Sequence, residues 1–157
     1  MTPPGVAISR RLRHDSGVIV DCAVYTQGKR APGPLQVEDA LEAARGTPES
    51  FVWIGLHEPT EEEFDLVAAE FQLHPLAIED AVTAHQRSKL ERYGDCLFMV
   101  FKTARYDDER EVIEFSELQL FAGQGFVITV RHGLASALAP VRRLLEDEPE
   151  WLARGPT

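Results

Sequence analysis

Two hydrophobic periodicities alternate along the chain and predict strands and helices in turn. Apolar runs rich in β-branched and aromatic residues predict strands at Gly17–Tyr25, Phe51–Leu56, Leu97–Tyr106, Val112–Phe121 and Phe126–Val130. Apolar residues spaced by three and four positions predict helices at Gln36–Arg45, after Thr60, at Pro75–Ala84 and around Leu138–Leu145. Because strands interleave with helices, we expect an α/β fold, a three-layer α/β/α sandwich with a central mixed β-sheet.

Three local patterns add detail to this prediction. Thr60 and Glu63 fit a capping box, in which each residue satisfies a free backbone N–H of the other at a helix start. The segment Phe126–Val130 is apolar at nearly every position, which is typical of a central strand covered on both faces. Along Val112–Phe121 the apolar alternation changes phase, and this slip predicts a β-bulge near Ser116–Glu117.

Length and composition favour one globular domain without a membrane span. The chain has 157 residues, of which 44% are hydrophobic, enough for a single core. Its longest uninterrupted apolar run is Cys96–Phe101, whereas a membrane-spanning helix needs roughly 20 apolar residues. We expect residues 1–16, with two prolines and a cluster of arginines, to be a flexible N-terminal tail and residues 17–157 to form the domain. Cys22 and Cys96 are not clustered, which indicates free thiols in a reducing compartment.

The charge balance narrows the classes of partner. The chain carries 16 Lys and Arg against 26 Asp and Glu, for a formal net charge of -10. Phosphate recognition needs a basic face, so this balance disfavours nucleic acid and anionic lipid as main partners. An acidic surface attracts cations instead.

The densest polar stretch, Leu73–Tyr93, leaves three interpretations open. His74, Glu79 and His85 could form a metal-dependent hydrolytic site, although their spacings of five and six fit no single helix face. Glu79 and Asp80 could form half of an oxygen-ligand site for a hard cation such as Mg²⁺ or Ca²⁺. The residues alone favour the third interpretation, an ordinary solvated helix face with His74 as its N-cap. The chain has neither a Gly-rich phosphate loop nor a nucleophile elbow, and we expect no enzymatic activity.

This stretch resembles the CorA family of magnesium and cobalt transporters. The most specific part is Leu73–Phe98, which reads LHPLAIED, then HQR, KLE and YGDCLF; the similarity runs from about residue 18 to the end. It also includes WIGL at Trp53–Leu56, Pro59-Thr60 before an acidic helix, and the strand FVITVRH at Phe126–His132. Ser88 replaces the proline that usually follows His-Gln-Arg in the family.

The resemblance implies the family's N-terminal cytoplasmic domain, which precedes a stalk helix and two membrane helices. Family members are homopentamers that conduct Mg²⁺, and intracellular Mg²⁺ bound between neighbouring cytoplasmic domains holds the channel closed. The family's regulatory aspartate matches Asp80, and its neighbouring glutamate matches Glu79. The partner carboxylates would lie beyond Thr157, as would the helices that reach the membrane. We therefore expect a regulatory domain at the cytoplasmic face of the inner membrane, with Mg²⁺ shared between subunits.

Two further alternatives stay open within this interpretation. A zinc-transporting branch of the family shares the domain, but zinc prefers nitrogen and sulfur ligands, and the five histidines and two cysteines form no tight cluster. Mg²⁺ or Co²⁺ is therefore favoured over Zn²⁺. The chain could also be a stand-alone soluble metal-responsive interaction module, because it lacks the pore signature Gly-Met-Asn.

Overall fold

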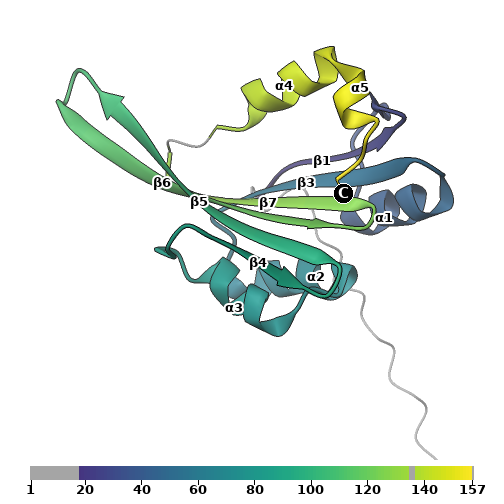
Figure 1. Cartoon of the computed structure of the whole chain (residues 1–157), viewed down its shortest axis with the longest axis horizontal. Helices are drawn as coiled ribbons and strands as arrows, with labels where there is room; N and C mark the ends of the chain where they lie inside the picture. Colours follow the sequence, from purple (N-terminus) through teal and green to yellow (C-terminus); the bar gives the residue numbers. More distant parts are fainter. Residues whose placement is uncertain (1–17, 135–136, 157) are drawn as a thin grey trace, which may run out of the picture.

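A seven-stranded mixed sheet forms the centre of the computed structural model, which describes residues 18–134 and 137–156 (Figure 1). The strands are β1 (Ile19–Thr26), β2 (Lys29–Arg30), β3 (Ser50–His57), β4 (Lys89–Tyr93), β5 (Cys96–Asp107), β6 (Val112–Gly123) and β7 (Phe126–His132). Their spatial order is β2-β1-β3-β7-β6-β5-β4. The β3–β7 pair is parallel and the other pairs are antiparallel, so the predicted mixed sheet is confirmed.

Helices cover both faces of this sheet and complete the predicted three layers. Helices α1 (Val37–Gly46), α2 (Glu61–Phe71) and α3 (Pro75–Val82) lie on one face, below the sheet in Figure 1. Helices α4 (Ala139–Asp147) and α5 (Pro149–Leu152) lie on the other face. Among the described residues, none of the helices combines the length and the apolar character needed to cross a membrane. The tail predicted at residues 1–16 lies outside the described residues.

Burial on both faces explains the continuous apolar runs of the inner strands. In β3, Val52 and Ile54 join the large core beneath α1, α2 and α3, whereas Phe51 and Trp53 join a smaller core beneath α5. Strand β7 occupies the middle of the sheet, as predicted for Phe126–Val130. The capping box is also confirmed, because the Thr60 hydroxyl accepts the Glu63 N–H and the Glu63 carboxylate accepts the Thr60 N–H.

The β-bulge predicted near Ser116–Glu117 is wrong. Strands β5 and β6 pair in one unbroken register from Leu97↔Ala122 to Asp107↔Val112. The phase change has another cause: Glu117 and Gln119 are polar but lie buried on the face that also carries Phe121. Phe115 shares this phase, but it lies on the outer part of the hairpin and is 71% exposed.

Three short elements are absent from the prediction, and several element ends differ from it by one or two residues. The pattern missed β2, β4 and α5, and α3 ends at Val82 rather than Ala84. Strand β2 forms a tight hairpin with β1 through Gly28, whose φ is +80°. A Cβ at Gly28 would lie 2.0 Å from the Pro149 carbonyl oxygen, so this turn packs against α5 only as glycine.

Candidate functional site

Helix α3, which carries the predicted cation ligands, begins with a side-chain cap. His74 is the N-cap, and its Nδ1 accepts the backbone N–H of Leu76 at 3.2 Å. Pro75 follows at the first helical position, where its missing N–H costs no hydrogen bond. The His74 ring also stacks on Tyr93 of β4, with ring centroids 4.7 Å apart. The N-cap role predicted for His74 is therefore confirmed.

The two predicted ligands are neighbours on α3 but face different surroundings. The Asp80 carboxylate accepts a hydrogen bond from the Lys89 ammonium of β4, and its side chain is 24% exposed. The Glu79 side chain is exposed and lines a hollow of about 240 Å³ together with Glu61 at the start of α2. Glu79 thus offers its oxygens to solvent, whereas Asp80 is already neutralised within the chain.

A row of polar contacts continues from Asp80 along the edge strand β4. Lys89 lies 3.1 Å from the Glu91 carboxylate, which in turn accepts the Tyr93 hydroxyl at 2.6 Å. The hydrogen bond to Asp80, with a second to Glu91, raises the pKa of Lys89 above its usual value. The hydrogen bonds from Tyr93 and Lys89 lower the pKa of Glu91. Since Tyr93 stacks on His74, this row contacts α3 at both of its ends.

Side chains from the sheet hold the C-terminal end of α3. Gln119 of β6 donates to the Asp80 carbonyl at 3.2 Å, and a ring nitrogen of His132 of β7 lies 3.1 Å from the Ala81 carbonyl. The backbone N–H of His85, just after α3, donates to the Glu117 carboxylate at 3.0 Å. The contacts from Gln119 and His132 satisfy carbonyls that a helix end leaves free, and the contact to Glu117 satisfies a backbone N–H. The phase change in the β6 sequence is the signal of Glu117 and Gln119, because it marks polar residues at buried positions.

Glu117 is the buried charge of this group. Its side chain is 4% exposed, and Lys102 of β5 donates to it at 2.7 Å. Burial raises the pKa of Glu117, but hydrogen bonds from Lys102 and Gln119 outweigh burial and leave the pKa lowered. The carboxylate is therefore kept charged beneath α3.

The residues of the hydrolytic interpretation do not converge on one point. His74 is engaged as the N-cap, and the His85 backbone is held by Glu117 in a left-handed conformation with φ of +80°. Within residues 18–134 and 137–156, no group of three or more His, Cys, Asp or Glu side chains is placed to hold a metal ion.

The donor set on α3 fits part of a hard-cation site. Mg²⁺ commonly binds through one or two carboxylates and keeps several of its waters. Glu79 and Asp80 supply two adjacent carboxylates, and Glu79 is open to solvent. Further oxygen ligands would have to come from water or from another polypeptide segment.

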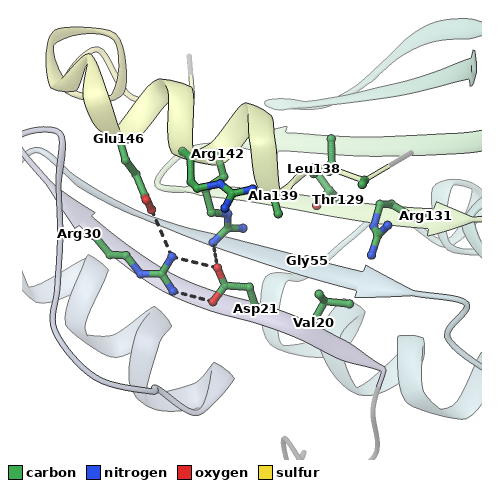
Figure 2. Close-up of a pocket in the computed structure, with 12 residues that line it drawn as sticks. Val20, Asp21, Arg30, Gly55, Thr129, Arg131, Leu138, Ala139, Arg142 and Glu146 are labelled. Carbon is green, nitrogen blue, oxygen red and sulfur yellow. Dashed lines mark hydrogen bonds and ion pairs between the residues drawn. The ribbon is translucent and has the colours of Figure 1, made fainter. Parts of the chain in front are cut away.

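A second charged cluster lies on the opposite face of the sheet (Figure 2). Arg142 of α4 pairs with Asp21 of β1, and Arg30 bonds both Asp21 and Glu146. These residues line a cavity of about 330 Å³ between α4 and the sheet. The Tyr25 hydroxyl donates to Glu146 at 2.6 Å, and burial together with this bond raises the pKa of Tyr25. The cluster balances its own charges and attaches α4 to the sheet; no periodicity in the sequence indicated it.

Comparisons with known proteins agree on one family. The model of the family described as "CorA-like Mg2+ transporter protein" matches residues 48–152. YfjQ of Bacillus subtilis is 33% identical over 107 residues, covering 68% of this chain and 32% of that protein. The "Cobalt/magnesium transport protein CorA" of Thermotoga maritima is 31% identical over 72 residues, covering 46% of this chain and 20% of that protein. This chain thus spans a third or less of the length of these relatives.

A solved structure supports the fold independently. The soluble domain of CorA from Methanocaldococcus jannaschii superposes with a TM-score of 0.61 at 16% identity, covering 88% of this chain and 52% of that one. At 16% identity this likeness shows a shared fold. The family model, however, matches more than half of the 157 residues, and the chain therefore belongs to the CorA-like Mg²⁺ transporter family.

Proposed function

We propose that this chain is the cation-sensing regulatory domain of a CorA-like divalent cation transporter. In this proposal the domain lies at the cytoplasmic face of the membrane, binds rather than catalyses, and Glu79 and Asp80 are its ligands for a regulatory Mg²⁺. The observation that carries the proposal is the pair of adjacent carboxylates on α3, of which Glu79 is exposed and Asp80 is partly exposed. Membership of a metal ion transporter family supplies the context.

The electrostatics of such a surface provide a sensing mechanism. Two carboxylates about 4 Å apart repel by about 4 kcal/mol at an effective dielectric constant near 20. If α3 faces carboxylates of a neighbouring subunit in a homopentamer, this repulsion separates the subunits. A bound divalent cation supplies the opposite charge. Glu79 and Asp80 then bind the cation more tightly in the closed arrangement than in the open one, which is the differential affinity that regulation requires.

The ligand chemistry favours Mg²⁺, with Co²⁺ next. Carboxylate oxygens suit hard cations, whereas Zn²⁺ prefers nitrogen and sulfur. Among the described residues, no His or Cys joins Glu79 and Asp80 in a group of three side chains placed to hold a metal ion, so the donors on α3 are carboxylates alone.

Paramagnetic broadening by Mn²⁺, a hard cation of similar ligand preference, tests the site directly. Amide NMR signals of the 157-residue chain are recorded during a MnCl₂ titration. Signals from α3 should broaden first, and excess MgCl₂ should reverse the effect. The Glu79→Gln/Asp80→Asn variant should lose the broadening.

A matched control is available at the tip of the β5–β6 hairpin. Asp108 and Glu109 are also adjacent and exposed, but they lie on a different element from α3. The Asp108→Asn/Glu109→Gln variant removes the same charge and should leave the broadening of α3 unchanged. Equal loss in both double variants, or no preferential broadening of α3, would contradict the proposal.

A further inference from the structure

The Asp80 carboxylate already has a cation beside it, supplied by the same chain. The Lys89 ammonium donates to Asp80 and also lies 3.1 Å from the Glu91 carboxylate. Its side chain is 25% exposed, similar to the 24% of Asp80. A divalent cation approaching Asp80 therefore meets a positive charge at the same carboxylate.

Lys89 is held at this position by the geometry of β4. Lys89 pairs with Val100 of the neighbouring strand, which fixes its backbone, and its ammonium lies 5.5 Å from the centre of the Phe98 ring. Lys89, Glu91 and Tyr93 alternate along the strand and share one side of it. Glu91 is fixed by the Tyr93 hydroxyl, so a second carboxylate remains beside Lys89 when Asp80 is withdrawn.

We infer that Lys89 is an intrachain counter-ion that competes with the divalent cation for Asp80 and so sets the concentration at which α3 responds. This inference rests on the proposed function of Glu79 and Asp80. The ammonium has two positions. It bonds Asp80 when the cation is absent, and it retains only its contact with Glu91 when the cation binds Asp80. The contact to Asp80 is therefore an internal inhibitor of cation binding.

The exchange also reaches the N-cap of α3. Lys89 bonds Glu91, Glu91 bonds Tyr93, and Tyr93 stacks on His74. A shift of Lys89 toward Glu91 changes the charge beside Tyr93, on which the N-cap side chain rests. Cation binding near the C-terminal end of α3 therefore changes the surroundings of the N-cap at its other end.

Affinity measurements on the 157-residue chain test this inference without any transport assay. Amide chemical shifts of α3 are followed during a MgCl₂ titration at constant ionic strength, and a Kd is fitted for each variant. Lys89→Met should lower the Kd about tenfold, equivalent to about 1.4 kcal/mol. Lys89→Arg keeps the charge and should leave the Kd within about threefold of the wild-type value, a difference of under about 0.7 kcal/mol.

Arg92→Met provides the matched control. Arg92 lies on the same strand as Lys89 but on its opposite side, and it is an exposed cation that pairs with Asp95 at 3.8 Å. Its loss removes the same charge and should leave the Kd unchanged. The metal-free amide spectrum of each variant reports whether it folds, and Lys89→Gln replaces Lys89→Met if the latter does not.

The outcomes separate this inference from the proposed function. If Asp80→Asn weakens Mg²⁺ binding but Lys89→Met does not tighten it, the counter-ion inference fails and the proposed function stands. A higher Kd in Lys89→Met would also overturn it, because Lys89 would then position Asp80 for the cation. If Asp80→Asn leaves the Kd unchanged, Asp80 is not a ligand and both fail.

Discussion

The ion pair between Asp21 of β1 and Arg142 of α4 should respond unequally to the loss of its two partners. Arg142 is 8% exposed, and its guanidinium lies 4.2 Å from the centre of the Trp53 ring. Among the described residues, Asp21 is the carboxylate that it contacts. Asp21 has a second cation, because Arg30 bonds it at 2.7 and 3.0 Å (Figure 2).

The structure gives the size of this difference. Asp21→Asn leaves a buried guanidinium without a carboxylate, and breaking a buried pair in this way costs about 3–5 kcal/mol. The lower end applies, because the Asp21 side chain is 29% exposed. Arg142→Met removes a charge-assisted hydrogen bond worth about 1.5–3 kcal/mol, but Arg30 still neutralises Asp21 and the Met side chain still covers Trp53. We expect Asp21→Asn to be more destabilising by about 1 kcal/mol.

Urea unfolding followed by far-UV circular dichroism measures this difference. The m-values of the variants should agree, so that the midpoints report stability. In an Arg30→Met background Asp21 loses its second cation, and Arg142→Met should then become about as destabilising as Asp21→Asn. If Arg142→Met proves the more destabilising in the wild-type background, the argument that Arg30 compensates for it is refuted.

Three further predictions concern other parts of the fold. Thr60→Ala removes the N-cap of α2 and should lower the free energy of unfolding by about 1 kcal/mol in urea titrations. Thr60→Ser keeps the capping hydroxyl and should retain most of this stability; an equal loss of stability in both variants would argue against the cap. Glu117 has a lowered pKa when folded, so its stabilisation is present above the unfolded pKa of about 4.3 and is lost as the pH falls through the folded pKa. The stability difference between wild type and Glu117→Gln should therefore shrink from neutral pH to about pH 3 in urea unfolding, and a constant difference would contradict this. Burial raises the pKa of Cys22 to about 12, so DTNB should modify the half-buried Cys96 first. Equal rates of thiol modification in Cys22→Ser, which leaves Cys96, and in Cys96→Ser, which leaves Cys22, would contradict this prediction.

The parts of the fold that follow from local signals were predictable from the sequence. The Thr60 capping box is a contact between residues three apart, and the continuous apolar run of β7 reflects burial on both faces of the sheet. Pro75 suits the first helical position, and the structure confirms His74 before it as the N-cap. In each case the residues that decide the structure are neighbours in the chain.

The parts that depend on contacts between distant strands were not predictable. Strand β4 is short, polar and at the sheet edge, so its sequence lacks the apolar alternation of a strand. The polar residues Glu117 and Gln119 occupy core-facing positions of β6 because they bond the backbone N–H of His85, just after α3, and the Asp80 carbonyl of α3. The pairing of Asp80 with Lys89 likewise requires the register of β4 against β5, which no local pattern reveals.

Helices α2 and α3 are attached to the sheet in different ways, which bears on the proposed response of α3 to a cation. Helix α2 buries the large side chains Phe64 and Phe71, each worth about 1.5–3 kcal/mol. Helix α3 fully buries only the small residues Ala77 and Ala81, while its Ile78 and Val82 are partly buried against the same core. Polar contacts hold both of its ends. Such contacts contribute about 0.5–1.5 kcal/mol each and can be exchanged one at a time. Under the proposed function, a cation that takes over the Asp80 contact would exchange a polar contact of α3 and leave Phe64 and Phe71 of α2 buried.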